Sequence, residues 1–599
     1  MSKDVSEIFQ EREAHFRGLF QNELKRYRIL STARLVWFSI AIVLEVYLAN
    51  IKNGEAMWMT GLVFVCVFVV LIIWHRRTVK RKEFYRCLAE INAEELRRIS
   101  GDLKGLDGGD EFTDPAHAYV ADLDIFGNNS LYALVNRAHT EEGRRVMATW
   151  LSAPADRDTV QARQLAVLEL GERMEWRQEL QAKGRMSAGK QNTDDRLYEW
   201  LESDSYIMPG GKFYYLFFLL SLALITSLAL AFFDIIPLGI SGLLAIVNTL
   251  YLLSLQKAVK TVTDGSEKSL KSLAGYESLI KHIETQRFKT ETLEELARTF
   301  DLEGTKASEA VEKLNKILFA LNSRANIFYP AMDILFLLDL YWLIKAVRWR
   351  KKYGSSIRSW FEAVGNIEAL ASISGFSAAN PAYRFPKVTD ERYAFEAESL
   401  GHPLIPSDRR VTNDFGLSGD GSVCLVTGSN MSGKSTFLRT VGVNAVLALG
   451  GAPVCADSMR ISVMQVYTGM RTSDSLEENV SSFYAELRRI RGLLDRLGEG
   501  VPVFFMLDEI LKGTNSKDRH AGAAALIRQL NRNGCTGMVS THDLELGQMA
   551  VESSYLKNFH FSSDIDGDEI NFDYKLKEGI CKSFNASKLM ERMGIEMNA

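Results

Sequence analysis

The sequence has little proline, few cysteines and almost no net charge, and each shortage excludes a class of protein. Eleven prolines and 43 glycines in 599 residues exclude collagen-like and low-complexity chains. The six cysteines are scattered, without a C-x-x-C pair or a histidine at zinc-ligand spacing, which predicts reduced thiols rather than a disulfide framework or a zinc site. A formal net charge of −4 provides no global field that would hold nucleic acid or an anionic membrane non-specifically.

The length predicts about three or four domains, and the apolar residues are concentrated in four runs. Residues 57–74, 213–233 and 235–255 carry no charged side chain and are about long enough to cross a bilayer as helices. Asp234 separates the last two runs and Pro237 follows closely, which predicts a tight hairpin. Residues 35–48 form a shorter run that contains Glu45, and we expect it to pair with 57–74. The sequence therefore predicts four transmembrane helices in two hairpins.

Basic residues flank the outer ends of both predicted hairpins. They are Lys25, Arg26, Arg28, Arg34, Arg76, Arg77, Lys80, Arg81, Lys82, Lys212, Lys257 and Lys260. The positive-inside rule then predicts a multi-pass protein of the inner cell membrane with its soluble domains in the cytoplasm. The alternative is that these runs are buried helices of a large soluble core. The charged first thirty residues predict no signal peptide.

A further apolar run, residues 327–344, contains Asp333 and Asp339. Charged side chains are rare in membrane spans. We therefore expect this run to be a helix packed in a soluble domain.

A phosphate-binding loop is predicted at residues 428–436. A short β-prone run, 422–427, leads into the pattern G-x-x-x-x-G-K-S, and an apolar helical pattern follows. The glycines allow the backbone N–H groups to surround a phosphate, Lys434 would reach the β and γ phosphates, and Ser435 would bind Mg²⁺. The alternative is a glycine turn without nucleotide. The predicted nucleotide-binding residues are Gly428, Ser429, Asn430, Met431, Ser432, Gly433, Lys434, Ser435 and Thr436.

Two further strand-like runs end in polar residues. Residues 503–507 are apolar and precede Asp508 and Glu509, as expected for a buried parallel strand that carries acids to the phosphate edge of a sheet. Asp508 would bind Mg²⁺, and Glu509 would polarise the attacking water. Residues 537–541 precede His542, which would sense the γ-phosphate. Glu509 and His542 are the predicted catalytic residues, although a strand can end in acids, and a single histidine can be structural.

Ser481 and Ser482 precede an amphipathic helical run that begins at residue 484. They can simply cap this helix. In ATPases whose sites are completed by a second subunit, such a helix start faces the partner's γ-phosphate. We therefore include both serines among the predicted nucleotide-binding residues.

Taken together, these motifs resemble the MutS family from about residue 110 to the end of the chain. The phosphate loop is similar to T-G-P-N-M-x-G-K-S-T, including Asn430 and Met431. Residues 401–404, 413–414, 508–515, 540–542 and 574–584 resemble other landmarks of that ATPase domain, although Asn585 replaces an expected glycine. Residues 124–154 are similar, more weakly, to the family's helical core. The resemblance implies a homodimer that uses ATP and Mg²⁺ and binds DNA.

The resemblance also implies the fold class: a C-terminal α/β P-loop ATPase domain of the ABC type and a mostly α-helical core and lever domain. We predict N-terminal helices with a transmembrane hairpin over 1–100, a helical core interrupted by the second hairpin over 101–390, and the ATPase domain over 391–599.

The chain departs from a mismatch-reading MutS protein in its first hundred residues. The predicted hairpin occupies the place of the mismatch-recognition domain, and we read the tripeptide at 9–11, which matches that domain's Phe-x-Glu wedge, as chance. We expect a membrane-anchored ATPase that contacts DNA, if at all, through phosphates and without mismatch-specific contacts. The alternative is a membrane scaffold or transport-coupled motor that does not bind DNA.

Overall fold

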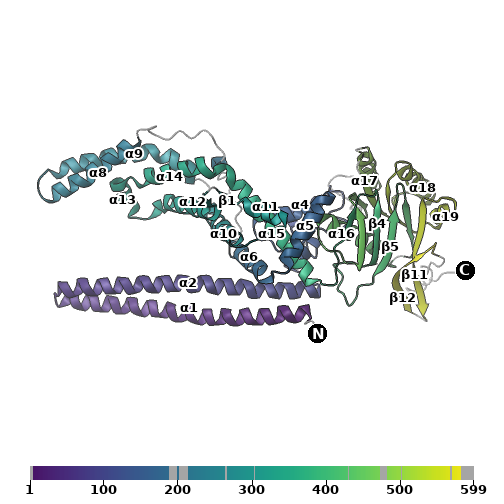
Figure 1. Cartoon of the computed structure of the whole chain (residues 1–599), viewed down its shortest axis with the longest axis horizontal. Coiled ribbons are helices and arrows are strands. Elements are labelled where there is room, and N and C mark those ends of the chain that lie inside the picture. The colour runs from purple at the N-terminus through teal and green to yellow at the C-terminus, as the bar shows by residue number, and fades with distance from the viewer. Residues whose placement is uncertain are drawn as a thin grey trace.

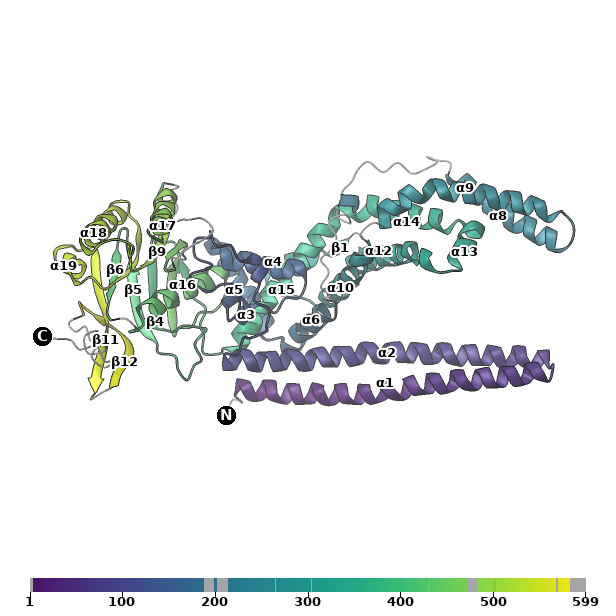
Figure 2. The same cartoon turned by 180° about the vertical axis from the view of Figure 1, so that it is seen from behind.

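The computed structural model describes residues 4–187, 199–201, 214–263, 266–302, 304–429, 431–471, 482–498, 500, 502–566 and 569–581. The molecule is elongated, as Figures 1 and 2 show. An α/β part lies at one end, and two helical hairpins project toward the other end. A helical core connects them. The turns of both hairpins lie at the end remote from the α/β part.

The first hairpin consists of two long antiparallel helices, α1 (Val5–Asn50) and α2 (Gly54–Ser100). The carboxylate of Asp4 caps α1, the side chain of Asn53 caps α2, and Gly101 ends α2 with a φ of 77°, a conformation that favours glycine. The apolar runs lie beside the turn and face outward, with Leu35 67% and Trp58 79% exposed. The predicted pairing of 35–48 with 57–74 therefore matches the structure.

The second hairpin consists of α8 (Tyr214–Phe232) and α9 (Leu238–Thr263), which contact each other. Asp234 lies in the turn with a φ of 56°. Among the described residues, three helices, α1, α2 and α9, are long and apolar enough to cross a membrane. In α8 the described apolar part, Phe218–Phe232, is shorter. Length and composition thus support three of the four predicted transmembrane helices.

The helical core lies between the hairpins and the α/β part. It contains α3 (Leu131–Val135), α4 (Glu141–Ser152), α5 (Arg157–Gly171), α6 (Met174–Ser187), α10 (Ser266–Glu284), α11 (Glu291–Arg298), α12 (Ala307–Asn322), α13 (Tyr329–Phe336), α14 (Leu338–Tyr353) and α15 (Ile357–Ala379). Short pieces complete it: the 3₁₀ turns η1 (Asp110–Phe112), η3 (Ser323–Ala325) and η4 (Gly354–Ser356), and the strands β1 (Asp301–Leu302) and β2 (Thr305–Lys306).

Residues 327–344, predicted as one helix, are instead interrupted at Leu337, which has a φ of 50°.

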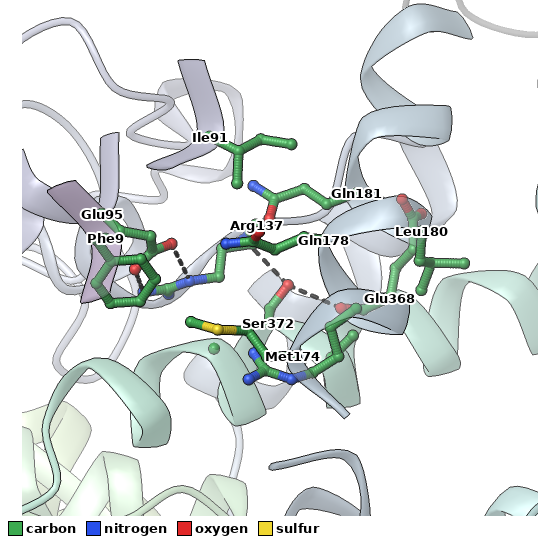
Figure 3. Close-up of a pocket in the computed structure, with 13 residues that line it drawn as sticks. Phe9, Ile91, Glu95, Arg137, Met174, Gln178, Leu180, Gln181, Glu368 and Ser372 are labelled. Carbon is green, nitrogen blue, oxygen red and sulfur yellow. Dashed lines mark hydrogen bonds and ion pairs between the residues drawn. The ribbon is translucent and has the colours of Figure 1, made fainter. Parts of the chain in front are cut away.

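A buried ionic cluster attaches the first hairpin to the helical core (Figure 3). Glu95 of α2 accepts bonds from Arg137 at 2.7 Å and from Arg98 at 3.2 Å. Burial alone would raise the pKa of Glu95, but the two guanidinium groups outweigh it and hold the pKa below its ordinary value. Since removal of one partner of a buried ion pair is strongly destabilising, this end of the hairpin is fixed to the core.

Glu368 of α15 is a buried acid in the same region, 3% exposed. The backbone N–H groups of His139 and Thr140 donate to its carboxyl group at 3.2 and 3.3 Å, and the Thr140 hydroxyl also donates to it. Burial raises the pKa of Glu368 to about 7. Because the folded state favours the protonated carboxyl, the contribution of Glu368 to the free energy of unfolding is fully present below the pKa that Glu368 has in the unfolded chain. This contribution is lost as the pH rises through about 7.

We therefore predict that wild type loses stability between pH 5 and pH 8 and that Glu368→Gln, which has no carboxyl group to ionise at this position, loses less over the same range. The pKa shift of Glu368 corresponds to a change of roughly 3 kcal/mol at most in the free energy of unfolding. Thermal unfolding of the full chain in detergent at both pH values measures the difference. The exposed Glu362 on the same helix provides the control, Glu362→Gln. An equal response of wild type and Glu368→Gln to pH would contradict the prediction.

The α/β part contains two sheets. The six-stranded sheet has the order β12-β11-β6-β10-β9-β8, and its strands are parallel except for β12. Its strands are β6 (Val423–Thr427), β8 (Gln465–Gly469), β9 (Val503–Asp508), β10 (Thr536–Thr541), β11 (Leu556–Asp566) and β12 (Glu569–Glu578). The apolar runs of β6, β9 and β10 are fully buried, as strands of a parallel sheet covered on both faces require.

The second sheet has the order β3-β7-β4-β5. Its strands are β3 (Lys387–Thr389), β4 (Ala394–Leu400), β5 (Asn413–Ser418) and β7 (Ser458–Ser462), and the helices of this part are α16 (Lys434–Gly450), α17 (Ser482–Leu497), α18 (Ser516–Arg532) and α19 (Leu544–Glu552). The predicted combination of an α/β part and a helical part therefore matches the structure. The domain boundaries remain a prediction.

Candidate nucleotide-binding site

Three parallel strands bring the predicted site residues together. In the sheet register Thr427 of β6 lies beside Thr541 of β10, and Ser540 of β10 lies beside Asp508 of β9. The loop after β6 leads into α16. Because ligands bind at the carboxyl ends of parallel strands, this edge is where a nucleotide site is expected.

The loop between β6 and α16 requires its two glycines. Gly428 has a φ of 151°, and a Cβ there would lie 2.8 Å from the Ser432 hydroxyl and 2.9 Å from the Phe561 carbonyl oxygen. Gly433 has a φ of 105°, and its Cβ would lie 3.0 Å from the Tyr574 ring. Only glycine adopts these conformations without strain. The glycines thus allow a tight backbone turn at the start of a helix, the arrangement that binds phosphate.

Lys434, the first residue of α16, is almost fully buried. Its Nζ atom donates hydrogen bonds of 2.9 Å to the carbonyl oxygens of Gly428 and Ser429. Burial lowers the pKa of Lys434, and the carboxylates of Glu509 and Asp508 partly oppose the shift. The amine is therefore held over the loop, close to both predicted acids.

The acids after β9 are oriented by residues of β10 and of the following loop. The Ser540 hydroxyl donates to Asp508. Nε2 of His542 lies 2.5 Å from Oε1 of Glu509, and Nζ of Lys512 lies 3.1 Å from Oε2. The bond with His542, together with Lys512, lowers the pKa of Glu509 to about 2. Glu509 is therefore a fixed carboxylate at neutral pH, suited to orienting a water molecule.

A cavity of about 390 Å³ lies over the loop, within the usual range for small-ligand sites. Besides the loop and Glu509, its lining includes His402, Arg409, Asn413 and Tyr574. Burial, with the nearby Arg439 and Arg410, lowers the pKa of His402 to about 4, so this imidazole is neutral at physiological pH. The sequence motifs contained His402, Asn413 and Tyr574 but gave no sign that these side chains line one cavity, and they missed Arg409.

Comparison with known proteins identifies this part of the chain. Residues 424–593 match the family model of MutS domain V. This stretch of the chain is therefore similar to MutS domain V. The match includes the phosphate loop, the acids after β9 and His542.

Two relatives match part of the chain. Endonuclease MutS2 of Lactococcus lactis subsp. lactis is 30% identical over 247 residues, 41% of this chain and 31% of the relative. The DNA mismatch repair protein MutS of Natronomonas pharaonis is 28% identical over 244 residues, 40% of this chain and 28% of the relative. The chain thus spans about a third of the length of these curated relatives.

The oxygen donors in the region that matches MutS domain V suit Mg²⁺. Ser435 is exposed in the first turn of α16, and the carboxylate of Asp508 ends β9. Hydroxyl and carboxylate oxygens are the ligands that a hard cation prefers. Near them, the buried Ser432 hydroxyl has no hydrogen-bond partner within the described part of the chain. These residues fit a bound magnesium nucleotide.

Three predicted residues cannot be placed in full. Asn430 and Ser481 lie outside the described residues, and Ser482 begins α17 with a side chain that is not described. The rest of α17 packs on the loop after Glu509. Glu486 accepts a hydrogen bond from the Leu511 backbone N–H, and a Cβ on Gly513 would lie 2.6 Å from that of Phe483. The start of α17 is thereby fixed to the segment that carries Glu509.

Proposed function

We propose that the protein is a membrane-anchored ATPase that binds and hydrolyses MgATP in a homodimer and couples this cycle to DNA binding. The observation that carries the proposal is a cavity lined by Lys434 and Glu509, with His542 bonded to Glu509, in a region that matches MutS domain V. The name of one relative, DNA mismatch repair protein MutS, supports DNA as the ligand.

Each residue has a proposed part in hydrolysis. The loop N–H groups and Lys434 bind the β and γ phosphates, and Ser435 and Asp508 would hold Mg²⁺, which neutralises phosphate charge when bound. Glu509 orients the attacking water. His542 is bonded to Glu509 in this structure. It would respond to the presence or absence of the γ-phosphate by keeping or releasing that bond. Ser481 and Ser482 complete the partner's site at the start of α17.

Contacts between the MutS domain V and the helical core support coupling. Asp124, before α3, bonds to Arg439 of α16 at 3.4 Å and to Arg471, after β8, at 2.8 Å. Asp122 accepts from the Thr468 hydroxyl at 2.7 Å and from the Arg471 N–H at 2.9 Å. One segment of the core is therefore bonded both to the phosphate-loop helix and to the strand that precedes the Ser481 segment. A movement of either would be passed to the core.

Anchoring in the bilayer explains the exposed apolar surface of both hairpins. We predict that the full-length protein stays in the membrane pellet after a carbonate wash, because only a bilayer covers side chains such as Trp58, Leu62 and Leu243, which are 79%, 67% and 64% exposed. Immunodetection in pellet and supernatant measures the partition. Recovery of the protein in the supernatant would refute anchoring.

Duplex DNA tests the proposed ligand. We predict that it stimulates ATP turnover by the purified full-length protein, and that rising salt weakens the effect, since phosphate contacts release counterions. The same turnover with a DNA mismatch and with a perfect duplex is expected, because no mismatch-specific contact is proposed.

A second candidate is a motor that acts on the membrane segments. It is favoured by the contacts of α9 with α12 and α14, which link the second hairpin directly to the core. ATP turnover that is indifferent to DNA at low salt would support this candidate and contradict the DNA proposal.

A further inference from the structure

We propose that η3, α13 and the start of α14 form a re-entrant segment inside the cytoplasmic half of the bilayer, with Ile327 and Phe328 in contact with lipid acyl chains. This inference rests on the proposed membrane anchoring of the second hairpin. It replaces the expectation that residues 327–344 pack in a soluble domain.

The first observation is where α13 lies. It contacts both α8 and α9, and Figures 1 and 2 show it beside this hairpin and remote from the α/β part. The Ser221 hydroxyl of α8 donates to the Leu335 carbonyl, and the Asn248 amide of α9 donates to the Ile334 carbonyl at 2.9 Å. Both helices of the hairpin therefore hold the end of α13.

These bonds fix the depth of α13. At about 1.5 Å per residue, Ser221 lies about 16 Å from the end of α8 at Phe232, and Asn248 about 15 Å from the start of α9 at Leu238. A hydrocarbon core is about 30 Å thick. If the hairpin turn lies at the outer surface, residues 334–335 are near the middle of the bilayer.

The other end of α13 cannot leave the hydrocarbon core. Tyr329–Phe336 is a single helix of about 12 Å at the usual rise per residue. Ile327 and Phe328 directly precede it. Even if α13 pointed straight at the cytoplasm, they would lie within the roughly 15 Å of one leaflet's hydrocarbon.

The segment has the surface that this environment requires. Four large apolar side chains face outward: Ile327 is 85%, Phe328 73%, Met332 45% and Phe336 43% exposed. This surface is continuous with the apolar surface of α8 and α9, to which α13 is bonded. Apolar side chains this exposed are unfavourable in water and favourable among acyl chains.

The two carboxylates of the segment, Asp333 and Asp339, are buried and bonded. Asp339 is fully buried, lies 2.7 Å from Arg324 and accepts from the Tyr329 hydroxyl at 2.8 Å. Asp333 accepts from the Asp339 backbone N–H at 2.8 Å and so caps α14 after the break at Leu337. Charged groups within a membrane pair with one another and face the protein interior.

The backbone at the break is satisfied as well. The interruption at Leu337 ends the helical bonding of α13, which would leave carbonyl oxygens without donors. Ser221 and Asn248 bond two of them. Irregular backbone at membrane depth is tolerated when it is buried against protein and its polar groups are bonded, and this break meets both conditions.

Fluorescence quenching by lipid tests the inference. The full-length protein is prepared with the exposed Cys66 replaced, as Cys66→Ala. It then receives one new labelling site, Phe328→Cys, Leu243→Cys or Leu165→Cys. Each variant is labelled with an environment-sensitive maleimide dye and placed in phosphatidylcholine–phosphatidylglycerol vesicles, with or without bromine on the acyl chains. All three positions are exposed, so the substitutions leave the core packing intact.

Leu243 on α9 is the control for the hairpin, and Leu165 on α5 is an exposed leucine of the core. We expect bromolipids to quench the Phe328→Cys label as strongly as the Leu243→Cys label and to leave the Leu165→Cys label unchanged. Quenching of the label at Leu243→Cys but not of the label at Phe328→Cys would overturn this inference and leave the anchoring proposal standing. No quenching at either position would overturn the anchoring proposal itself.

Discussion

Lys434→Ala is expected to lose ATP binding by roughly 100-fold or more, since truncating one partner of a buried, hydrogen-bonded charge pair costs about 2–5 kcal/mol of binding free energy. Nζ of Lys434 is buried, bonded to two loop carbonyls and close to Glu509 and Asp508. The variant loses the positive charge that would face the β and γ phosphates, and it leaves two carbonyl oxygens without their donor. Equilibrium binding of a fluorescent ATP analogue to the full-length protein measures the loss.

The matched control for Lys434→Ala is Lys557→Ala, because Lys557 is an exposed lysine on β11 of the same sheet. It should bind the nucleotide as wild type does. Thermal unfolding shows whether either variant is misfolded. Wild-type affinity in a folded Lys434→Ala protein would exclude this loop as the nucleotide site.

Glu509→Gln is expected to slow hydrolysis by about 10²–10⁴-fold, the usual contribution of a positioned general base, while ATP stays bound. The carboxylate is fixed by His542 at 2.5 Å and Lys512 at 3.1 Å, and its pKa of about 2 keeps it ionised. An amide of nearly the same shape preserves the packing and removes the negative charge that orients water. Single-turnover hydrolysis of prebound ATP measures the chemical step without product release.

Glu545→Gln is the control for this variant, since Glu545 is an exposed carboxylate at the start of α19 in the same domain. It should hydrolyse ATP at the wild-type rate. If Glu509→Gln hydrolyses prebound ATP as fast as wild type does, Glu509 does not act in the chemical step, and the assignment of this edge of the sheet as the catalytic centre fails.

The motifs of the predicted site could be found in the sequence because each depends on local order along the chain. A β-prone run, a glycine loop and a helix must be adjacent in sequence to bind phosphate, and strands that end in Asp508 and His542 meet at one edge once they are parallel. The roles of Arg409 and Tyr574 in the cavity could not be predicted in this way. They come from segments far apart in sequence, and only the packing of the two sheets places them over the loop.

For residues 327–344, the sequence pattern led to an incorrect prediction. Asp333 and Asp339 indicated a soluble helix because an isolated charge is unfavourable in a bilayer. The structure pairs Asp339 with Arg324 and uses Asp333 as a helix cap. Both partners depend on the break at Leu337 and on the turn after α12, which hydropathy does not report. The prediction of one uninterrupted helix was therefore wrong.

The two hairpins were predicted from apolar runs, yet α1 and α2 extend far beyond those runs. Charged residues continue both helices because good helix formers such as Glu, Lys and Arg sustain a helix that a partner helix supports. The inner ends are fixed by Glu95 and Arg137, a pair 42 residues apart that no local pattern indicates. The predicted domain limits over 1–100, 101–390 and 391–599 remain predictions.

Steady-state phosphate release by the full-length protein in lipid vesicles tests the central claim most directly. Wild type, Lys434→Ala and Glu509→Gln are compared at the same protein and MgATP concentrations. The account predicts continuous turnover by wild type and a loss of roughly 100-fold or more in both variants. Equal turnover by wild type and either folded variant would contradict it.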